Sequence, residues 1–264
     1  MSTSFTSPGP HLAGDPAVIV ARRFEDVVVG NEISRHNLLS RLSHWAVAVS
    51  FAVAMLSGMP IWTPVFGWMA HLFGGLSVCR LVHPWAGVAF FLFSAERFFQ
   101  WLRDMHFRDP DVDWFRQRAT KKGRAGIDDS QVGKYNGGQK LYFWAVSLGS
   151  IGLLVSGLVM WFPLSFPPLV RQLAFVIHDL TFICFAVSLV IHVFLSTAAE
   201  PGTFVSMSRG TVTRAWARLH HPRWYREVLS GHLPARFLKA GCGTSRTPLR
   251  PRPPARSSAI SPRR

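Results

Sequence analysis

Cysteine is scarce in this sequence of 264 residues, which has three, and no two of them are close together. The sequence therefore lacks a Cys-x-x-Cys-His motif for covalent haem attachment and lacks the cysteine pairs of zinc sites. It also lacks an amino-terminal apolar run followed by a cleavage site. We therefore expect no signal peptide and expect the first apolar segment to remain as an anchor.

Acidic residues are few as well: 14 Asp and Glu stand against 29 Lys and Arg, for a formal net charge of +15. Such a charge occurs in nucleic-acid-binding proteins. Here the basic residues avoid the long apolar stretches and gather between them, which is typical of a membrane protein with charged loops. The distribution predicts contacts with lipid headgroups or a partner subunit, and no binding of nucleic acid.

Four segments approach the about 20 apolar residues needed to cross the hydrocarbon core of a bilayer. They span approximately residues 44–65, 81–102, 141–162 and 173–197. We therefore expect an all-α fold, an integral membrane bundle of four transmembrane helices. Glu96 and Arg97 fall near the end of the second segment, where we expect them to pair with each other or Arg97 to reach the headgroups.

The distribution of Lys and Arg predicts the orientation. Residues 1–43 contain four, 103–140 contain nine and 198–264 contain thirteen, whereas the two other connections contain one each. The positive-inside rule therefore places both termini and the middle loop in the cytoplasm.

The first and third segments share the pattern Ser-Gly-x-x-x-Trp-x-Pro, as SGMPIWTP and SGLVMWFP. Trp62 and Trp161 are expected at the outer membrane interface, and the proline two residues after each helps to end the helix. Gly58 and Gly157 allow close approach either of a neighbouring helix or of a flat ligand.

The fourth segment, FVIHDLTFICFAVSLVIHVF, carries His178 and His192, fourteen residues apart. On a helix this spacing puts both on one face, about 21 Å apart along the axis. The orientation places His83 level with His178 in the outer half, and His44 level with His192 in the inner half. The pattern therefore predicts two pairs of imidazoles at two depths.

Paired imidazoles inside a helical bundle suit axial ligation of haem iron. The alternatives are interhelical hydrogen bonds, a proton relay, or zinc, which usually requires three or four protein ligands at one depth. The remaining histidines lie in tails or polar loops and are expected to be solvated: His11, His36, His71, His106, His220, His221 and His232.

The middle loop ends in VGKYNGGQK, residues 132–140. Gly137 and Gly138 allow close backbone approach, and Asn136 and Gln139 offer amide donors and acceptors. The segment fits a glycine-containing helix entry. It also fits a quinone headgroup site, because it lies on the same side as the predicted His44 pair.

Five motifs together resemble the gamma subunit of respiratory formate dehydrogenase, a membrane cytochrome b. They are SHW at 43–45, HP at 83–84, KYNGGQK at 134–140, the histidine pair of the fourth segment, and HHPRWYRE at 220–227. The resemblance covers roughly residues 35–228.

This resemblance implies a four-helix anchor with two b-type haems in the bacterial inner membrane. His83 and His178 would hold the outer haem iron, and His44 and His192 the inner one. The segment containing Asn136, Gly138 and Gln139 would bind a quinone, menaquinone or ubiquinone. Electrons would come from a molybdenum or tungsten catalytic alpha subunit through an iron–sulfur beta subunit, so this chain would not itself oxidise formate. Asp179 is more polar than the pattern suggests; it could bond a neighbouring helix or tune the outer haem.

We expect three regions: an amino-terminal cytoplasmic extension (1–34), the cytochrome domain (35–228) and a basic tail rich in Pro, Arg and Ser (229–264), which we expect to be disordered. HHPRWYREVL is expected to form a short interfacial helix with Trp224 and Tyr225 at the membrane surface.

The sequence leaves two other functions open. One is a cytochrome b for another quinone-linked enzyme, such as a hydrogenase or a thiosulfate or polysulfide reductase. The other is a haem-free transporter or membrane anchor.

Overall fold

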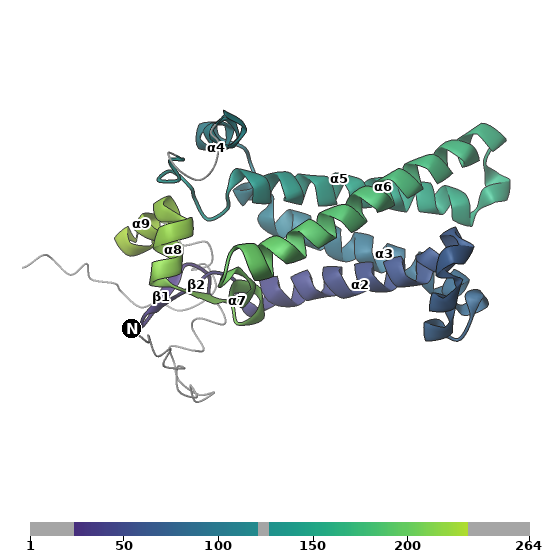
Figure 1. Cartoon of the computed structure of the whole chain (residues 1–264), viewed down its shortest axis with the longest axis horizontal. Coiled ribbons are helices and arrows are strands. Elements are labelled where there is room, and N and C mark those ends of the chain that lie inside the picture. The colour runs from purple at the N-terminus through teal and green to yellow at the C-terminus, as the bar shows by residue number, and fades with distance from the viewer. Residues whose placement is uncertain (1–23, 121–126, 232–264) are drawn as a thin grey trace, which may run out of the picture. The chain divides into compact units, whose positions relative to one another are not determined.

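The computed structural model describes residues 24–120 and 127–231 of the chain. Four long helices lie side by side (Figure 1): α2 (Leu38–Trp62), α3 (Leu76–Trp101), α5 (Gly137–Trp161) and α6 (Pro168–Phe194). All four are long and apolar enough to cross a membrane. At 1.5 Å per residue they measure about 37–41 Å, more than the about 30 Å of the hydrocarbon core. The prediction of an all-α membrane bundle is confirmed.

Each helix begins four to six residues before the segment predicted for it. Polar caps explain the difference for two of them. Oδ1 of Asn37 accepts a hydrogen bond from the backbone of Ser40 at 2.7 Å, and Oδ1 of Asn136 accepts one from the backbone of Gln139 at 2.9 Å. A side chain of this kind satisfies an amide that the first helical turn leaves unpaired. Counting apolar residues misses these first turns because they contain polar residues.

Proline ends α2 and α5, as the shared motif predicted. The two helices finish at Trp62 and Trp161, and the 3₁₀ helices η1 (Pro64–Phe73) and η3 (Pro163–Ser165) follow directly. These two connections lie at the same end of the bundle, which we call the η1 end (Figure 1). Helix α6 continues into a short π-helix, η4 (Leu195–Ala199), at the opposite end.

Helix α3 packs against both α2 and α5, and α5 packs against α6. Midway along the bundle, the rings of Phe51, Phe90 and Phe185 form an aromatic cluster with centroids 5.2 to 5.8 Å apart. Each phenylalanine lies seven residues after one of the predicted ligands: His44, His83 or His178. The aromatic cluster therefore lies between the two predicted histidine levels.

At the end opposite η1, residues 24–37 and 203–231 form a small domain that we call the cap. A three-stranded antiparallel sheet has the order β1 (Val27–Val29), β2 (Glu32–Ser34), β3 (Thr211–Thr213). Three helices accompany it: α7 (Thr203–Ser208), α8 (Arg214–His220) and α9 (Pro222–Ser230). The sheet is a feature that the all-helical prediction lacked.

Trp224 shows how the cap differs from the sequence-based expectation. Residues 222–230 do form a helix, α9, but the Trp224 side chain is fully buried in the core of the cap rather than at a membrane surface. Its Nε1 donates a hydrogen bond to Oδ1 of Asp26 at 2.8 Å. Ile33, Val212 and Ala217 complete that core. A buried indole requires such a partner, and Asp26 is 198 residues away in the sequence.

The middle loop contains a further helix, α4 (Asp109–Thr120), preceded by the short 3₁₀ helix η2 (Leu102–Asp104). A buried ion pair holds α4 against the start of α5, since Nζ of Lys140 lies 2.5 Å from Oδ2 of Asp111. The same ammonium donates to the carbonyl of His106. The charged residues of this loop thus position the beginning of α5.

Candidate functional site

The structure brings His83 and His178 together near the η1 end. His83 projects from α3 and His178 from α6, and their ring centroids are 6.1 Å apart with the planes at 71°. This is the outer pair that the sequence predicted from depth. His83 is seven residues after the start of α3, and His178 is ten residues after the start of α6.

Hydrogen bonds fix which nitrogen of each outer histidine is free. Nδ1 of His83 lies 2.8 Å from the carbonyl oxygen of Ala54, which can only accept, so this nitrogen carries the proton. Nδ1 of His178 lies 2.9 Å from Oγ of Ser156, and that hydroxyl already donates to the carbonyl of Gly152 at 2.6 Å. Nδ1 of His178 is therefore also a donor. In both rings Nε2 is left as the unprotonated nitrogen that can bind a metal.

The two motif glycines lie against these same rings. A methyl group added at Gly58 would lie 2.7 Å from Cε1 of His83, and one added at Gly157 would lie 3.5 Å from Cε1 of His178. The repeated Ser-Gly pattern therefore places one small residue beside each outer histidine. The close neighbour of each glycine is an imidazole, which neither the helix-packing nor the flat-ligand interpretation specified.

His44 of α2 and His192 of α6 form the second predicted pair, nearer the cap. Their ring centroids are 6.2 Å apart and the planes make an angle of 43°. The ring of Tyr142 stacks on His192 with centroids 4.9 Å apart and planes 5° apart. Nδ1 of His44 is buried and has no hydrogen-bond partner among the described residues. An orphaned buried nitrogen of this kind indicates a site whose full set of contacts includes another group.

Asn136 and Gln139 form a capping box at the start of α5. Besides the bond from Gln139 to Asn136, the backbone N–H of Asn136 donates to Oε1 of Gln139 at 3.0 Å. Both side-chain oxygens are therefore used within the loop. Among the described residues, the two side-chain NH₂ groups donate no hydrogen bond, so they are the groups that this segment can offer to a ligand.

Gly138 lies beneath an aromatic side chain of α4. A methyl group added there would lie 3.0 Å from the Trp114 ring, and one added at Gly137 would lie 3.0 Å from Phe115. The two glycines thus allow α4 to pack over the first turn of α5. The sequence predicted that another group approaches this backbone closely. It did not predict that the group is an aromatic side chain of α4, because nothing in the sequence of α4 indicates that this helix packs on the start of α5.

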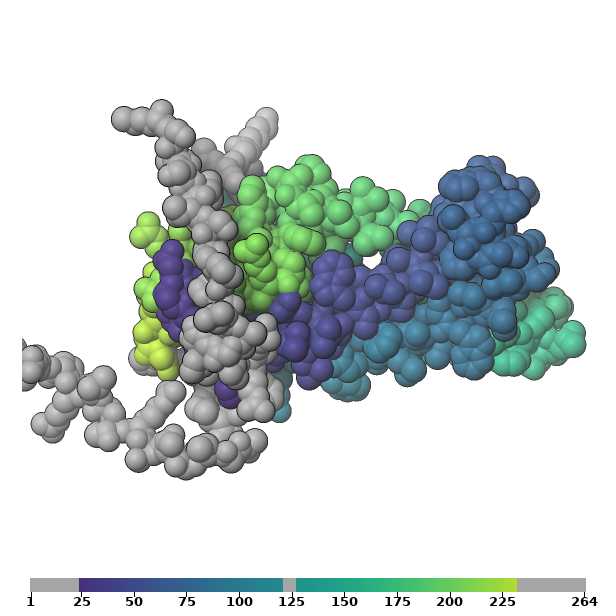
Figure 2. All heavy atoms as spheres, turned by 90° about the horizontal axis from the view of Figure 1, so that it is seen from below, coloured from purple at the N-terminus to yellow at the C-terminus, as the bar shows by residue number. Residues whose placement is uncertain are grey.

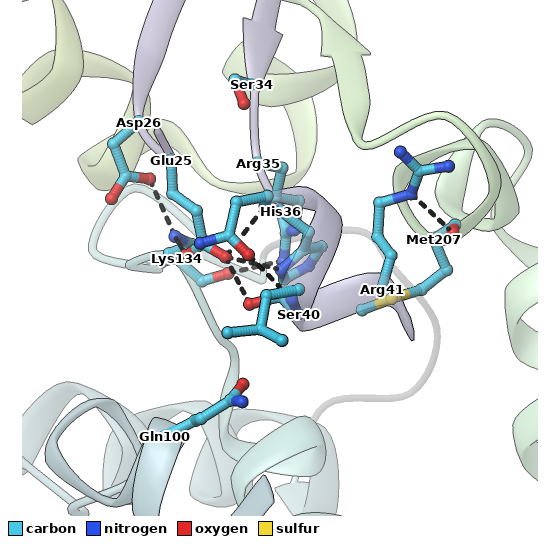
Figure 3. A network of polar contacts seen from close by, with 12 residues as sticks. Glu25, Asp26, Ser34, Arg35, His36, Ser40, Arg41, Gln100, Lys134 and Met207 are labelled. Carbon is cyan, nitrogen blue, oxygen red and sulfur yellow. Dashed lines mark hydrogen bonds and ion pairs between the residues drawn. The ribbon is translucent and has the colours of Figure 1, made fainter. Parts of the chain in front are cut away.

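The cap holds the segment before Asn136 through charged groups (Figure 3). Nζ of Lys134 lies 2.8 Å from Oε2 of Glu25 and 2.9 Å from Oδ1 of Asp26. Nη2 of Arg35 donates to the carbonyl of Lys134 at 2.6 Å. The Arg35 guanidinium also lies over three aromatic rings, those of Tyr135, Trp216 and Trp224, 5.0 to 5.7 Å from their centroids. Residues that flank β1 and β2, supported by tryptophans of α8 and α9, thereby fix the loop.

Burial shifts the pKa values of the ionisable groups around Lys134. For Glu25, burial alone would raise the pKa, but His36, whose Nδ1 is 3.8 Å away, and the charge of Lys134 outweigh it and hold the pKa well below its usual range. Burial lowers the pKa of His36 to about 3 and that of Arg35 to about 10. Burial also raises the pKa of Tyr135 well above its usual value. At neutral pH the carboxylate and guanidinium are therefore charged, while the imidazole and phenol are neutral.

Two histidines expected to be solvated are buried instead. His36 and His221 are each 2% exposed. Nδ1 of His221 lies 2.7 Å from the carbonyl of Gly133, to which it donates, and burial lowers its pKa well below the usual range. Polar neighbours in the sequence suggested solvent, but the cap covers both rings. His11 and His232 lie outside the described residues.

Glu96 and Arg97 also differ from the prediction, since they form no ion pair with each other. Arg97 is buried, donates to the carbonyl of Ser40 and to Oε1 of Gln100, and stacks 3.9 Å from the Trp101 ring centroid. Glu96 accepts from the amide of Gln100. The side-chain amide of Gln100 therefore bridges the two residues, accepting from Arg97 and donating to Glu96.

This chain is similar to known proteins over most of its length. Residues 35–210 match the family described as prokaryotic cytochrome b561. The formate dehydrogenase cytochrome b556(fdo) subunit of Escherichia coli strain K12 is 34% identical over 201 residues, which cover 74% of this chain and 93% of that protein. The nitrate-inducible formate dehydrogenase cytochrome b556(Fdn) subunit of the same strain is 33% identical over 204 residues, 74% of this chain and 91% of that protein.

A third relative, the formate dehydrogenase cytochrome b556 subunit of Haemophilus influenzae, is 30% identical over 217 residues, which cover 80% of this chain and 90% of that protein. The match to the family includes all four long helices and all four paired histidines. The chain therefore belongs to the prokaryotic cytochrome b561 family.

Proposed function

We propose that this chain is the membrane cytochrome b subunit of a formate dehydrogenase complex, and that it passes electrons through two b-type haems to a quinone. The observation that carries the proposal is the meeting of four histidines as two pairs inside the bundle, 6.1 and 6.2 Å apart. The relatives named for formate dehydrogenase indicate which complex the subunit serves.

The spacing of both pairs fits a metal between them. Two metal–imidazole bonds of about 2 Å each, plus the half-widths of two imidazole rings, give a centroid separation of about 6 Å. Nε2 is the free nitrogen of both outer histidines, and Nδ1 of His44 lacks a protein partner. His83 and His178 would thus hold one haem, and His44 and His192 the other. Haem iron supplies one-electron transfer at each site.

The described residues argue against zinc as the metal. No group of three or more His, Cys, Asp or Glu side chains within residues 24–120 and 127–231 is placed to hold a metal ion. A structural or catalytic zinc site usually has at least three such ligands. Pairs of histidines, in contrast, suit an iron whose four remaining ligands come from the macrocycle.

The distribution of Lys and Arg supports an orientation of the chain in the membrane. The cap end carries the basic segments, and the η1 end carries Arg80 and Arg171. By the positive-inside rule the cap would lie on the cytoplasmic side of a bacterial inner membrane. Electrons would enter at the outer pair from an iron–sulfur subunit, which receives them from a molybdenum or tungsten catalytic subunit. They would cross to the inner pair past the phenylalanine cluster.

The quinone would bind near Asn136, Gly138 and Gln139. The NH₂ groups of the two amides are the donors that the capping box leaves for a carbonyl oxygen of the headgroup. Gln139 and Tyr142 lie three residues apart on one face of α5, and Tyr142 stacks on His192. This short connection would bring the quinone site close to the inner pair, as electron transfer requires.

The test is a dithionite-reduced minus oxidised spectrum of the detergent-purified protein, with pyridine haemochrome quantification. We expect two b haems per chain, and one per chain after His83→Ala or His178→Ala. A single haem in the unsubstituted protein would overturn the two-site assignment. If the folded protein binds no haem, even when haem is supplied, the histidines serve only as hydrogen-bond partners and the chain is an anchor or transporter.

A further inference from the structure

Asp179 directly follows the outer ligand His178 in α6. The segments that build the η1 end, residues 58–85 and 156–182, contain no other acidic residue. The cations in these segments are Arg80 and Arg171. Arg80 is three residues before His83 in α3, and Arg171 is seven residues before His178 in the first turn of α6. A lone carboxylate beside an outer haem ligand is costly in a membrane, which indicates a function.

The Asp179 carboxylate has a specific partner. Nε1 of Trp62, the last residue of α2, donates to Oδ2 of Asp179 at 3.1 Å. The Trp62 ring also contacts Phe182 edge-on, with centroids 5.8 Å apart. Within the described residues Asp179 forms no ion pair, so its negative charge is not neutralised by a neighbouring cation.

This contact joins the end of α2 to α6. The space-filling view shows an opening between these two helices (Figure 2). They approach each other at His44 and His192, at Phe51 and Phe185, and at Trp62 and Asp179. Of these three contacts, the one between Trp62 and Asp179 lies on the His83 side of the phenylalanine pair. Trp62 is four residues after Gly58, where an added methyl group would touch the His83 ring.

A carboxylate next to His178 would act on an iron held by His83 and His178. Oxidised haem iron carries one more positive charge than reduced iron, so a nearby carboxylate stabilises the oxidised form and lowers the midpoint potential. In surroundings of low dielectric constant this interaction is stronger than in water. Burial, hydrogen bonding and charge around a haem are the properties by which a protein sets its potential.

We infer that Asp179 sets the midpoint potential of the outer haem, lowering it through its charge, and that Trp62 positions the carboxylate. This inference rests on the proposed two-haem function. Asp179 is then a charge-bearing residue and not an iron ligand, and Trp62 is the positioning residue. A low outer potential and a higher inner one would give electrons a downhill path from the outer side to the quinone.

The experiment is a potentiometric titration of the purified haem-loaded protein, followed by visible absorption and by the low-temperature EPR signal of each ferric haem. Asp179→Asn keeps an oxygen that can accept from Trp62 and removes the charge. We expect the ferrous-to-ferric ratio of the outer haem at a fixed potential to rise at least threefold, which for a one-electron couple is about 30 mV. The inner haem should not move, and it serves as the internal reference.

Trp62→Phe is the second variant, and its expected effect has the opposite sign. The indole N–H partly offsets the carboxylate charge, so its removal should lower the outer potential, by roughly twofold in the same ratio or about 18 mV. If the contact only holds two helices together, both variants should move the potential in the same direction or not at all, and the inference is overturned. If Asp179→Asn fails to retain the outer haem, the sign of the Trp62→Phe shift decides alone.

Haem content and midpoint potential distinguish a failure of the proposed function from a failure of the role of Asp179. An unsubstituted protein without an outer haem would overturn the proposed function and this inference together. An unsubstituted protein with both haems, but with an outer potential that neither variant shifts as expected, would overturn only the role of Asp179.

Discussion

Oγ of Ser156 lies 2.9 Å from Nδ1 of His178 and accepts a hydrogen bond from it, because the hydroxyl hydrogen is already directed to the carbonyl of Gly152. This bond orients the imidazole and makes its Nε2 more basic. We therefore expect Ser156→Ala to weaken binding at the outer site about 10- to 100-fold, the usual cost of losing such a partner. The rate of haem release to an excess of an apo-haem acceptor measures the loss.

The chain supplies a matched control for this experiment in the other Ser-Gly motif. Oγ of Ser57 donates to the carbonyls of Val53 and Ala54 in its own helix and touches no histidine nitrogen. Ser57→Ala should therefore leave haem release from both sites nearly unchanged. Equal effects of the two substitutions would show that the serines act on helix stability and not on His178.

Gly58 and Gly157 should differ in their tolerance of a methyl group. At Gly58 the added carbon would lie 2.7 Å from the His83 ring, closer than real contacts allow, whereas at Gly157 it would lie at an ordinary 3.5 Å from the His178 ring. We expect Gly58→Ala to displace His83 and remove most of the outer haem, and Gly157→Ala to retain it. Haem content per chain and the outer-haem EPR signal measure the difference. Full haem content in Gly58→Ala would show that His83 is not held in this position.

Capping and ligand binding can be separated at the start of α5. Asn136→Asp and Gln139→Glu preserve the oxygen acceptors of the capping box and remove the NH₂ donors, so α5 should keep its stability. Alanine at Asn136 should instead cost about 0.5–2 kcal/mol, as is usual for a lost N-cap. If the amides bind quinone, both conservative variants should slow haem reoxidation by a quinone analogue with haem content intact. Unchanged reoxidation would leave the loop with capping as its sole role.

The cap should loosen in mild acid because of His36. Burial lowers the pKa of His36 from 6.5 to about 3, so the opened cap binds a proton that the closed cap does not. The contribution of neutral His36 to the stability of the closed cap is therefore complete above about pH 6.5. Below that pH it falls by about 1.4 kcal/mol per pH unit. The lowered pKa of Glu25 adds a further loss only below its ordinary value of 4.5.

Hydrogen–deuterium exchange of the amides in β1, β2 and α9 between about pH 7 and pH 5, corrected for the intrinsic exchange rate, measures this free energy. His36→Gln should flatten the dependence on pH. His71→Gln is the control, since His71 is exposed at the η1 end. A slope that survives His36→Gln would assign the titration to another group, of which the buried His221 is the first to test.

The transmembrane part of the fold could be predicted because length and hydropathy determine it. Spacing alone put His178 and His192 on one face of α6, and depth alone gave each its partner, so the two close pairs followed from the sequence. The position of Gly58 against His83 did not follow, because it depends on the rotation of α2 relative to α3. A pattern along one helix carries no information on that rotation.

The cap could not be predicted for a different reason. Its strands are three residues each, too short to show alternation, and its contacts join distant parts of the chain, as Trp224 and Asp26 illustrate. His36 and His221 look solvated by sequence because their neighbours are polar. They are buried because the polar groups around them have other partners in the cap: Lys134 pairs with Glu25, and Arg35 donates to the carbonyl of Lys134.

The pairing of β2 with β3 has a consequence for the order of biogenesis. β2 precedes the first transmembrane helix and β3 follows the last, with Ile33 opposite Val212. During synthesis β2 must therefore wait until all four helices have been inserted before it can find its partner strand. Lys134, Arg35 and the loop that they hold reach their final arrangement only after that step. A chain truncated before Thr211 would insert its helices and leave the start of α5 without its support from the far end of the sequence.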